Sequence, residues 1–236
     1  MLAVYYIVLV PMVYLSFAVL ILGIIIRMVK IYHEPAHPIK LQIFPEKRPP
    51  LLWAFSDTFL FPTARKHRPA LWAFLVLFHI GFILLIIGHL ELIREFSIFQ
   101  VISHGAFLGR GFVGLILCIC VLFFLFRRII SPVKELSVPE DYYLLILLFL
   151  TFIFGSEMDW ARRWYGFDSI TGDDYRRYLM SLVSFKPVLP NALTSSGHSF
   201  MLVLHVFFAN LFMIFFPFSQ AMHSFLSLPM NEMKRG

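Results

Sequence analysis

The sequence predicts an all-α integral membrane protein, a bundle of five transmembrane helices. Of its 236 residues, 59% are hydrophobic and only 14% are charged, whereas soluble domains carry about 25% charged residues. The apolar residues gather in five blocks, each close to the roughly 20 residues that a helix needs to cross a bilayer. Because lipid offers no partner to backbone N–H and C=O groups, such blocks must form helices, and the alternating pattern of a membrane barrel is missing.

The five blocks define the expected helices. We place them at residues 3–26, 70–93, 105–126, 141–157 and 198–221. The first block is too long for a signal peptide and lacks a basic leader, so we expect it to be retained as a helix. The fourth is the shortest and needs Glu157 near an interface. Since neither an internal repeat nor a low-complexity run divides the chain, we expect a single domain over residues 1–236.

The basic residues predict how the bundle lies in the membrane. Most of the 20 Lys and Arg residues fall in the loop at 27–69, the loop at 127–140 and the C-terminal tail. Positively charged loops stay in the cytoplasm. We therefore expect the N-terminus outside and the C-terminus cytoplasmic, in a cytoplasmic (inner) membrane that the chain crosses several times. The loop at 27–69 is then cytoplasmic, and the loop at 158–197 lies outside.

Both of these loops are longer than hairpin connections require. The cytoplasmic loop contains "LLWAFSDTFLFP", for which we expect a short helix at the membrane interface. The outer loop interleaves Trp and Tyr with charges, a composition typical of the headgroup layer. Internal packing and contact with a partner are both open explanations for the two loops.

Four histidines stand within or at the end of apolar helices: His79 and His89 in the second, His205 and His223 in the fifth. Ionisable side chains in a membrane span are costly and mark functional sites. One isolated histidine could be explained by a hydrogen bond between helices. Two on each of two helices favour metal ligation instead, because neutral imidazole is the commonest metal ligand among side chains.

The spacing predicts which histidines meet. Ten residues advance a helix by about 15 Å, so His79 and His89 offer one ligand toward each leaflet. Eighteen residues make five turns and about 27 Å, which places His205 and His223 on one face. Because the two helices are antiparallel, we expect His79 to pair with His223 and His89 with His205. The two advances differ by about 12 Å, which tilt and a kink at Pro217 must absorb.

Dispersed pairs favour haem over other metals, which take three or four clustered ligands. We expect two haem groups, each with bis-histidine ligation. Gly81 and Gly88 stand beside the ligands and would let a flat macrocycle approach the backbone. A pairing of His198 with His205, two turns apart, is the alternative. A transporter would need broken helices and midplane carboxylates, and a plain membrane anchor would leave the histidines unexplained.

Three stretches resemble the gamma subunit of respiratory nitrate reductase: "LFHIGFILLIIGH", "LHVFFANLFMIFFPFSQAMH" and "FRRIISPVKELSVPEDYYLLIL". The resemblance implies a five-helix dihaem cytochrome b with its N-terminus outside. It implies electron exchange between membrane quinone, such as menaquinone, and a cytoplasmic iron–sulfur subunit. It also implies the ligands His79, His89, His205 and His223 in the cross-pairing above, whereas His198 has no counterpart ligand in that family.

The same superfamily contains membrane cytochromes of sulfite-reduction-associated and heterodisulfide-reductase-like complexes, whose cytoplasmic partner is a cysteine-rich iron–sulfur protein. Two departures favour this branch. The nitrate-type quinol site has a lysine in the outer loop before helix three, and "EFSIFQVISHGAFLGR" has none. The loop at 27–69 is also longer than the nitrate-type loop. The nitrate reductase gamma subunit is the alternative, with a beta-like iron–sulfur partner.

Quinol oxidation needs an acceptor for the hydroxyl protons. We expect His104 to serve at the outer end, because imidazole exchanges protons near neutral pH. Asp159, Glu91 or Glu95 would relay the proton, although each could equally be an ordinary interfacial charge.

Basic residues at the two ends of the bundle are candidates for haem propionates. We expect Arg110 or Arg94 to bind them at the outer end, because a guanidinium binds a carboxylate through two hydrogen bonds. At the inner end the candidates are Arg127, Arg128 and Lys66. Contact with lipid headgroups would explain the same charges. The sequence leaves the terminal substrate and the direction of electron flow open.

Overall fold

The computed structural model describes residues 2–33, 49–93, 112–164, 170–195 and 199–235. Within these ranges the chain is helical and contains no strand. Five helical segments are long and apolar enough to cross a membrane: Leu2–His33, Pro69–Ile93, Phe112–Ile129, Pro139–Met158 and Ser199–Phe218. The prediction of five apolar helices is confirmed. The expected start of the third, at residues 105–111, lies outside the described residues.

The first span is an interrupted helix that runs past the predicted end. It consists of α1 (Leu2–Leu9) and α2 (Pro11–His33). Pro11 carries no N–H, so the hydrogen-bond ladder breaks before it. Side chains from distant elements satisfy carbonyls near the break: Asn210 Nδ2 donates to Val8 O at 3.2 Å, and Tyr178 Oη donates to Leu9 O at 2.5 Å. Hydrogen bonds from α9 and α11 therefore hold the interrupted segment against the rest of the bundle.

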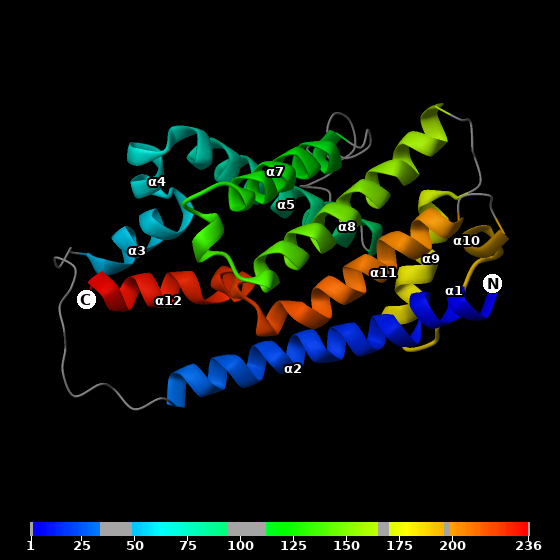
Figure 1. Ribbon diagram of the computed structural model, residues 1–236. Coiled ribbons are helices and arrows are strands. Elements are labelled where there is room, and N and C mark those ends of the chain that lie inside the picture. The colour runs from blue at the N-terminus through cyan, green and yellow to red at the C-terminus, as the bar shows by residue number, and fades with distance from the viewer. Residues whose placement is uncertain (1, 34–48, 94–111, 165–169, 196–198, 236) are drawn as a thin grey trace.

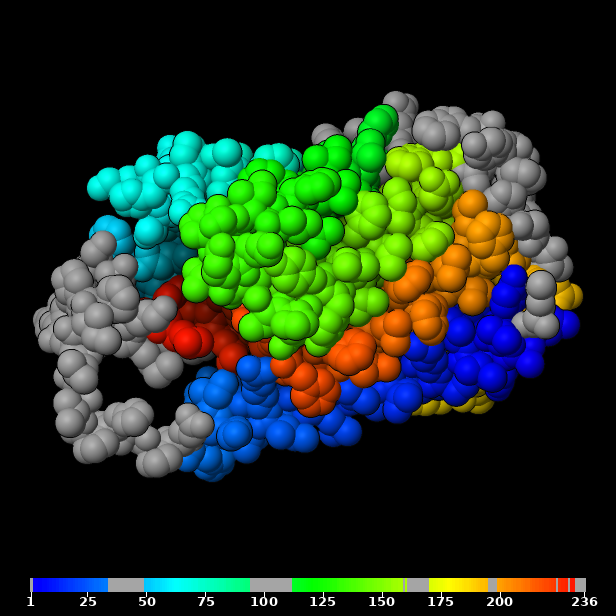
Figure 2. Space-filling model, in the orientation of Figure 1, coloured from blue at the N-terminus to red at the C-terminus, as the bar shows by residue number. Residues whose placement is uncertain are grey.

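The helices form one layered bundle (Figure 1). Besides α2, its long members are α5 (Pro69–Ile93), α7 (Phe112–Ile129), α8 (Pro139–Trp164) and α11 (Ser199–Phe215). Helix α5 packs on α7, α7 on α8, α8 on α11 and α11 on α2. Figure 2 shows α7, α8, α11 and α2 as successive strips across one face. The start of α1 and the end of α12 lie at opposite ends of the molecule, as an odd number of crossings requires.

Helix α5 divides its surface between protein and lipid. Its exposed apolar side chains recur every three or four residues: Leu77, Ile80, Ile83, Ile86 and Leu90. This spacing puts them on one face of the helix. Phe78, Phe82 and Leu85 instead pack against the core cluster that α7 and α8 form. An apolar face turned outward is what a lipid-facing helix requires.

The last span, for which we expected a kink at Pro217 within residues 198–221, is broken there rather than kinked. Helix α11 ends at Phe215, and two short turns follow, η4 (Phe216–Phe218) and η5 (Gln220–Met222), before α12 (His223–Arg235) begins. Pro217 cannot continue the ladder because it has no N–H. Arg27 Nη1 donates to the freed carbonyls of Pro217 at 2.8 Å and Ser219 at 3.4 Å. The rise of five whole turns between His205 and His223 therefore does not apply.

Short helices cover the end of the bundle that holds the C-terminus. They are α3 (Pro50–Phe59), α4 (Pro62–His67) and α12. Helix α12 packs along α3, and Asn231 Nδ2 donates to Thr58 Oγ1 at 3.0 Å. The expected short helix in "LLWAFSDTFLFP" is thus confirmed. At the opposite end, α9 (Gly172–Val183) and α10 (Asn191–Ser195) pack near α1 and the start of α11.

Candidate functional site

Two pairs of imidazole rings face each other between helices. His89 on α5 and His205 on α11 have ring centres 6.1 Å apart, with ring planes 20° from parallel. His79 on α5 and His223 at the start of α12 have centres 6.3 Å apart, with planes at 72°. These are the two pairs that the spacing predicts. The alternative partner, His198, lies outside the described residues.

The protonation of the four rings follows from their hydrogen bonds. Each Nδ1 lies within hydrogen-bond distance of a backbone carbonyl: His79 with Leu75 at 2.7 Å, His89 with Leu85 at 2.8 Å, His205 with Thr151 at 2.8 Å, and His223 with Gln220 at 3.0 Å. A carbonyl can only accept, so Nδ1 must carry the proton. In a neutral ring the lone pair is then on Nε2. Every ring thus has its second nitrogen free of a proton and able to ligate a metal.

The separations fit a single metal ion between the rings of each pair. A metal–nitrogen bond is about 2.0 Å, and a ring nitrogen lies roughly 1.1 Å from its ring centre, so two opposed imidazole ligands have centres about 6.2 Å apart. Both pairs match this value. Across the described ranges, no group of three or more His, Cys, Asp or Glu side chains could hold a metal. Two axial nitrogens alone suit a metal that brings its own equatorial ligands, which is the case for haem.

Aromatic side chains surround His79. The Phe61 ring lies 5.3 Å from the His79 ring, and the Phe78 ring lies 5.6 Å from it in an edge-on arrangement. Phe61 sits at the start of α4 in a left-handed backbone conformation, with φ of 47°. The short helices at this end of the bundle therefore contribute directly to the apolar surroundings of the His79–His223 pair.

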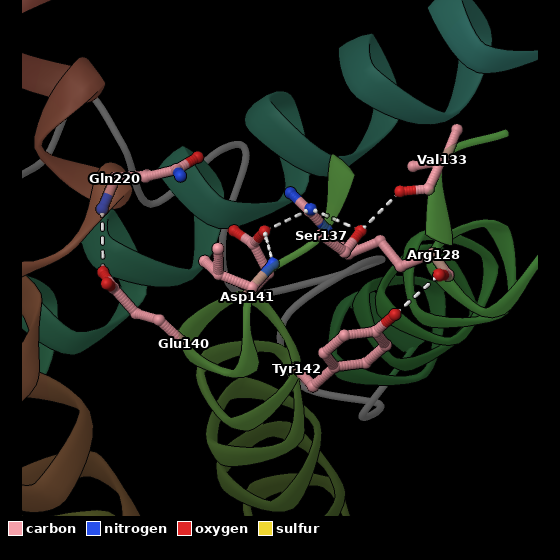
Figure 3. Close-up of polar contacts among 8 residues, drawn as sticks. Arg128, Val133, Ser137, Glu140, Asp141, Tyr142 and Gln220 are labelled. Carbon is pink, nitrogen blue, oxygen red and sulfur yellow. Dashed lines mark hydrogen bonds and ion pairs between the residues drawn. The ribbon is translucent and has the colours of Figure 1, made fainter. Parts of the chain in front are cut away.

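The backbone that carries His223 is held by the start of α8. Gln220 N donates to Glu140 Oε1 at 3.2 Å, and Gln220 O accepts from His223 Nδ1 at 3.0 Å. Figure 3 shows Glu140 reaching Gln220 beside the turn between α7 and α8. One peptide group of η5 thus connects a carboxylate of α8 to a ring of the candidate site.

The same turn uses Arg128 for the fold. Arg128 Nη1 donates to Asp141 Oδ2 at 2.7 Å, and Asp141 is only 6% exposed (Figure 3). Arg128 is therefore committed to a structural ion pair and is not available for a propionate. Its neighbour Arg127 faces two further cations, Arg68 and Arg128. The propionate role of Arg127 stays a prediction.

The glycines near the four histidines pack against different side chains. A Cβ atom at Gly81 would lie 3.1 Å from Leu117 Cδ2 on α7. The space that Gly81 leaves is thus filled by Leu117, so the geometry explains this glycine by helix packing rather than by clearance for a macrocycle. Gly88 lies on α5 directly before His89, and its predicted role stays a prediction. Gly155 on α8, which our sequence analysis missed, lies against one of the four rings: a Cβ atom added there would lie 3.0 Å from His205 Cε1.

The expected outer quinone site falls largely outside the described residues. His104, Arg110 and Glu95 all lie there, and so does the side chain of Asp159. Glu91 is described: it stands on α5 two residues after His89 and is 4% exposed. The proton-accepting role of His104 and the propionate role of Arg110 therefore stay predictions.

A family model matches the part of the chain that carries the four rings, and one relative matches about two thirds of the chain. The model of the family described as nitrate reductase gamma subunit matches residues 66–236. A protein described as "Hdr-like menaquinol oxidoreductase cytochrome b-like subunit", from Archaeoglobus fulgidus, is 27% identical over 184 residues. That match includes 68% of this chain and 49% of the relative, so the chain spans about half the relative's length. With all four histidines inside the matched region, the chain belongs to the nitrate reductase gamma subunit family.

Proposed function

We propose that the chain is the membrane cytochrome b subunit of a quinone-linked oxidoreductase complex, in which His89–His205 and His79–His223 each hold one haem b. The observation that carries this proposal is the pair of ring separations, 6.1 and 6.3 Å, between imidazoles whose Nδ1 protons are all donated to carbonyls. When bound, the two haems would supply one-electron carriers within the span. The protein would supply two ring nitrogens to each haem, and the Phe61 and Phe78 rings lie beside His79.

The orientation that we propose has the N-terminus outside and the C-terminus in the cytoplasm. The distribution of Lys and Arg supports it, because the C-terminal tail and the loops at 27–69 and 127–140 hold most of them. In this orientation the His89–His205 pair belongs to the outer leaflet. The His79–His223 pair then belongs to the cytoplasmic side, beneath α3, α4 and α12.

Electrons would pass between quinone in the membrane and an iron–sulfur subunit in the cytoplasm. Family membership and the menaquinol oxidoreductase named in the relative's description support this assignment. Quinol oxidation at the outer end, with His104 as the proton acceptor, would separate the proton from electrons that leave on the cytoplasmic side. Charge would then cross much of the bilayer, and the reaction would be electrogenic.

Of the two branches, we favour a complex of the heterodisulfide-reductase-like type, linked to sulfur respiration. The description of the Archaeoglobus fulgidus relative supports it. So does the lack of lysine in "EFSIFQVISHGAFLGR". The alternative is the gamma subunit of a nitrate reductase, which the family description supports. Mass spectrometry of the subunits that co-purify with the chain separates the two, because the cytoplasmic iron–sulfur partner differs.

Quinol-driven reduction tests the proposal. Membranes that contain the chain are mixed anaerobically with a reduced menaquinone analogue while the b-type absorption band is followed. We expect the band to rise in the wild type and to rise little in His205→Ala, because that variant lacks a ligand of the outer haem through which the electrons from quinol would enter. A haem-loaded complex in which no quinol reduces the band would contradict the quinone-linked function.

A further inference from the structure

His205 is oriented by a helix that supplies no ligand. Its Nδ1 donates to the carbonyl of Thr151 on α8 at 2.8 Å, across 54 positions of sequence. The other three rings donate to carbonyls three or four residues earlier in their own segment. Among the four rings of the candidate site, His205 is thus the one whose orientation is set by a neighbouring helix.

Gly155 lies on the same face of α8 as Thr151, one turn further along. A Cβ atom there would lie 3.0 Å from His205 Cε1 and 3.1 Å from Nδ1. Ordinary carbon contacts are about 3.5–4.0 Å, so any side chain at Gly155 would push the ring away. The lack of one allows the edge of the imidazole to rest against the α8 backbone, within reach of the Thr151 carbonyl.

Helix α8 is itself held firmly against α7 at the next residue. A Cβ atom at Gly114 on α7 would overlap Ser156 Oγ on α8, at 2.0 Å. Both residues are buried, and α7 and α8 share one core cluster. Because α7 packs so closely on Ser156, α8 cannot easily move away from α11 to make room for a side chain at Gly155. The position of the His205 ring therefore depends on Gly155 directly.

The two ring pairs differ in their mutual rotation. The planes of His89 and His205 are 20° from parallel, whereas those of His79 and His223 stand at 72°. In a low-spin ferric haem, the iron dxz and dyz orbitals interact with the π systems of the two imidazole ligands. Parallel imidazoles separate the energies of these two orbitals, and perpendicular imidazoles leave the energies nearly equal. The first case gives a rhombic electron paramagnetic resonance (EPR) signal, and the second gives a strongly anisotropic signal with one large g value.

We propose that Gly155 and the Thr151 carbonyl position His205 so that its ring is nearly parallel to that of His89, which makes the His89–His205 haem the rhombic one of two spectroscopically distinct haems. This inference rests on the proposed function. Gly155 acts here as a positioning residue, through its contact with a ligand rather than with substrate. The Nδ1–H···O=C bond to α8 also increases the electron donation of His205, as such second-shell bonds do for other metal ligands.

The test uses EPR spectra of the oxidised full-length chain, purified with its haem in lipid nanodiscs. The wild type is expected to show one rhombic and one strongly anisotropic low-spin signal. In Gly155→Ala the rhombic signal should shift in its g values and the matching haem should shift in midpoint potential, while the other signal stays in place. The matched control is Gly81→Ala, which crowds Leu117 by a similar distance without touching His205; it should leave the rhombic signal where it is.

An unchanged rhombic signal and potential in Gly155→Ala, with both haems retained, would overturn the inference. If this variant does not accumulate, His89→Ala and His205→Ala decide: each should lose the rhombic signal and keep the anisotropic one, and the reverse assignment would contradict the proposal. Two wild-type signals that are both strongly anisotropic would overturn it while leaving the dihaem function intact. A wild-type chain that binds no haem would overturn the proposed function and this inference together.

Discussion

The rings of His89 and His205 lie 6.1 Å apart with nearly parallel planes, although 116 positions of sequence separate them. Neither residue is held by the other, since each Nδ1 is bound to a backbone carbonyl. Two imidazoles that face each other without a shared hydrogen bond leave the lone pair of each Nε2 unused. A metal ion with two open axial positions would use both lone pairs.

Removal of one ring should cost one haem. His205→Ala is expected to reduce the haem content to about half, because the His79–His223 pair lies about 15 Å away along α5 and keeps both of its ligands. The haem-to-chain ratio of the purified variant measures this, with circular dichroism to confirm that the bundle stays helical. Equal loss of both haems from a helical variant would show that the pairing is wrong.

Glu140 should support the His79–His223 pair from a distance. In Glu140→Ala the Gln220 N–H loses its acceptor, so the η5 segment that orients His223 is less constrained. We expect weaker retention of the corresponding haem, by roughly the 10- to 100-fold that outer partners of metal ligands contribute. Haem transfer to apomyoglobin measures the retention rate. Glu140→Gln is the control, because its amide oxygen can still accept; a loss as large as that in Glu140→Ala would contradict the role of this hydrogen bond.

Asn210 should be important for the stability of the bundle. Its Oδ1 accepts from Ser16 Oγ at 2.8 Å and its Nδ2 donates to Val8 O at 3.2 Å, with Asn210 only 1% exposed. Hydrogen bonds between membrane helices average about 0.6 kcal/mol, but an unsatisfied buried group costs about 1–3 kcal/mol. We therefore expect Asn210→Ala to lower the free energy of unfolding by about 1–3 kcal/mol, as measured by denaturation in mixed micelles.

Ser16→Ala removes only one of those two bonds and is the comparison for Asn210→Ala. The loss should be smaller, and the double variant should lose less than the sum of the two single losses, because the two residues share one hydrogen bond. Strict additivity would mean that the Ser16–Asn210 bond contributes nothing to stability.

The start of α9 should loosen in acid. The Thr171 hydroxyl and backbone N–H both donate to the Asp174 carboxylate, at 2.7 and 3.0 Å, and Arg177 lies beside it. These contacts hold the pKa of Asp174 below its usual range, with the Thr171 hydroxyl as the largest cause. A lowered pKa means that the stabilisation is complete above the ordinary carboxyl pKa and is lost as the pH falls through the lower, folded-state value.

Hydrogen exchange of the α9 amides measures this dependence. Protection should fall as the pH drops below about 4, the range in which a free aspartate takes up its proton. Asp174→Asn should be less protected at neutral pH and should show little further change in acid. Asp173→Asn is the control, because Asp173 is 81% exposed; if it removed the acid sensitivity as fully as Asp174→Asn, the capping explanation would be wrong.

The apolar blocks and the histidine spacing were sufficient to predict the five helices and the two ring pairs. The helices follow from the length of each apolar run. The two pairs follow from the order of the histidines on two antiparallel segments; the fixed rise of a helix applies to His79 and His89 but not to His205 and His223, because the last helix is broken between them. The break after Phe215 was predicted only as a kink at Pro217. The extent of this break depends on Arg27 of α2, which binds the carbonyls of Pro217 and Ser219 although about 190 positions of sequence separate them. A contact between residues so far apart cannot be predicted from a local sequence pattern.

The roles of Gly81 and Gly155 also could not be predicted from the sequence alone. Proximity to the ligands along the chain suggested a cofactor role for Gly81, but Leu117 of α7 fills the space beside it. Gly155 is 50 positions from His205 and was passed over. A glycine within a membrane span signals a close approach of something to the backbone, and this signal was present in "FIFGSE". What approaches is decided by the packing of α8 against α11.

The haem content of the wild-type chain tests the central claim most directly. The chain is expressed with haem supplied, purified in its complex, and measured by its reduced-minus-oxidised spectrum and by the pyridine haemochrome method. The account predicts a b-type absorption band and about two haem b groups per chain, one for each histidine pair. A haem-free chain, or one with a single haem in a fully folded complex, would contradict it.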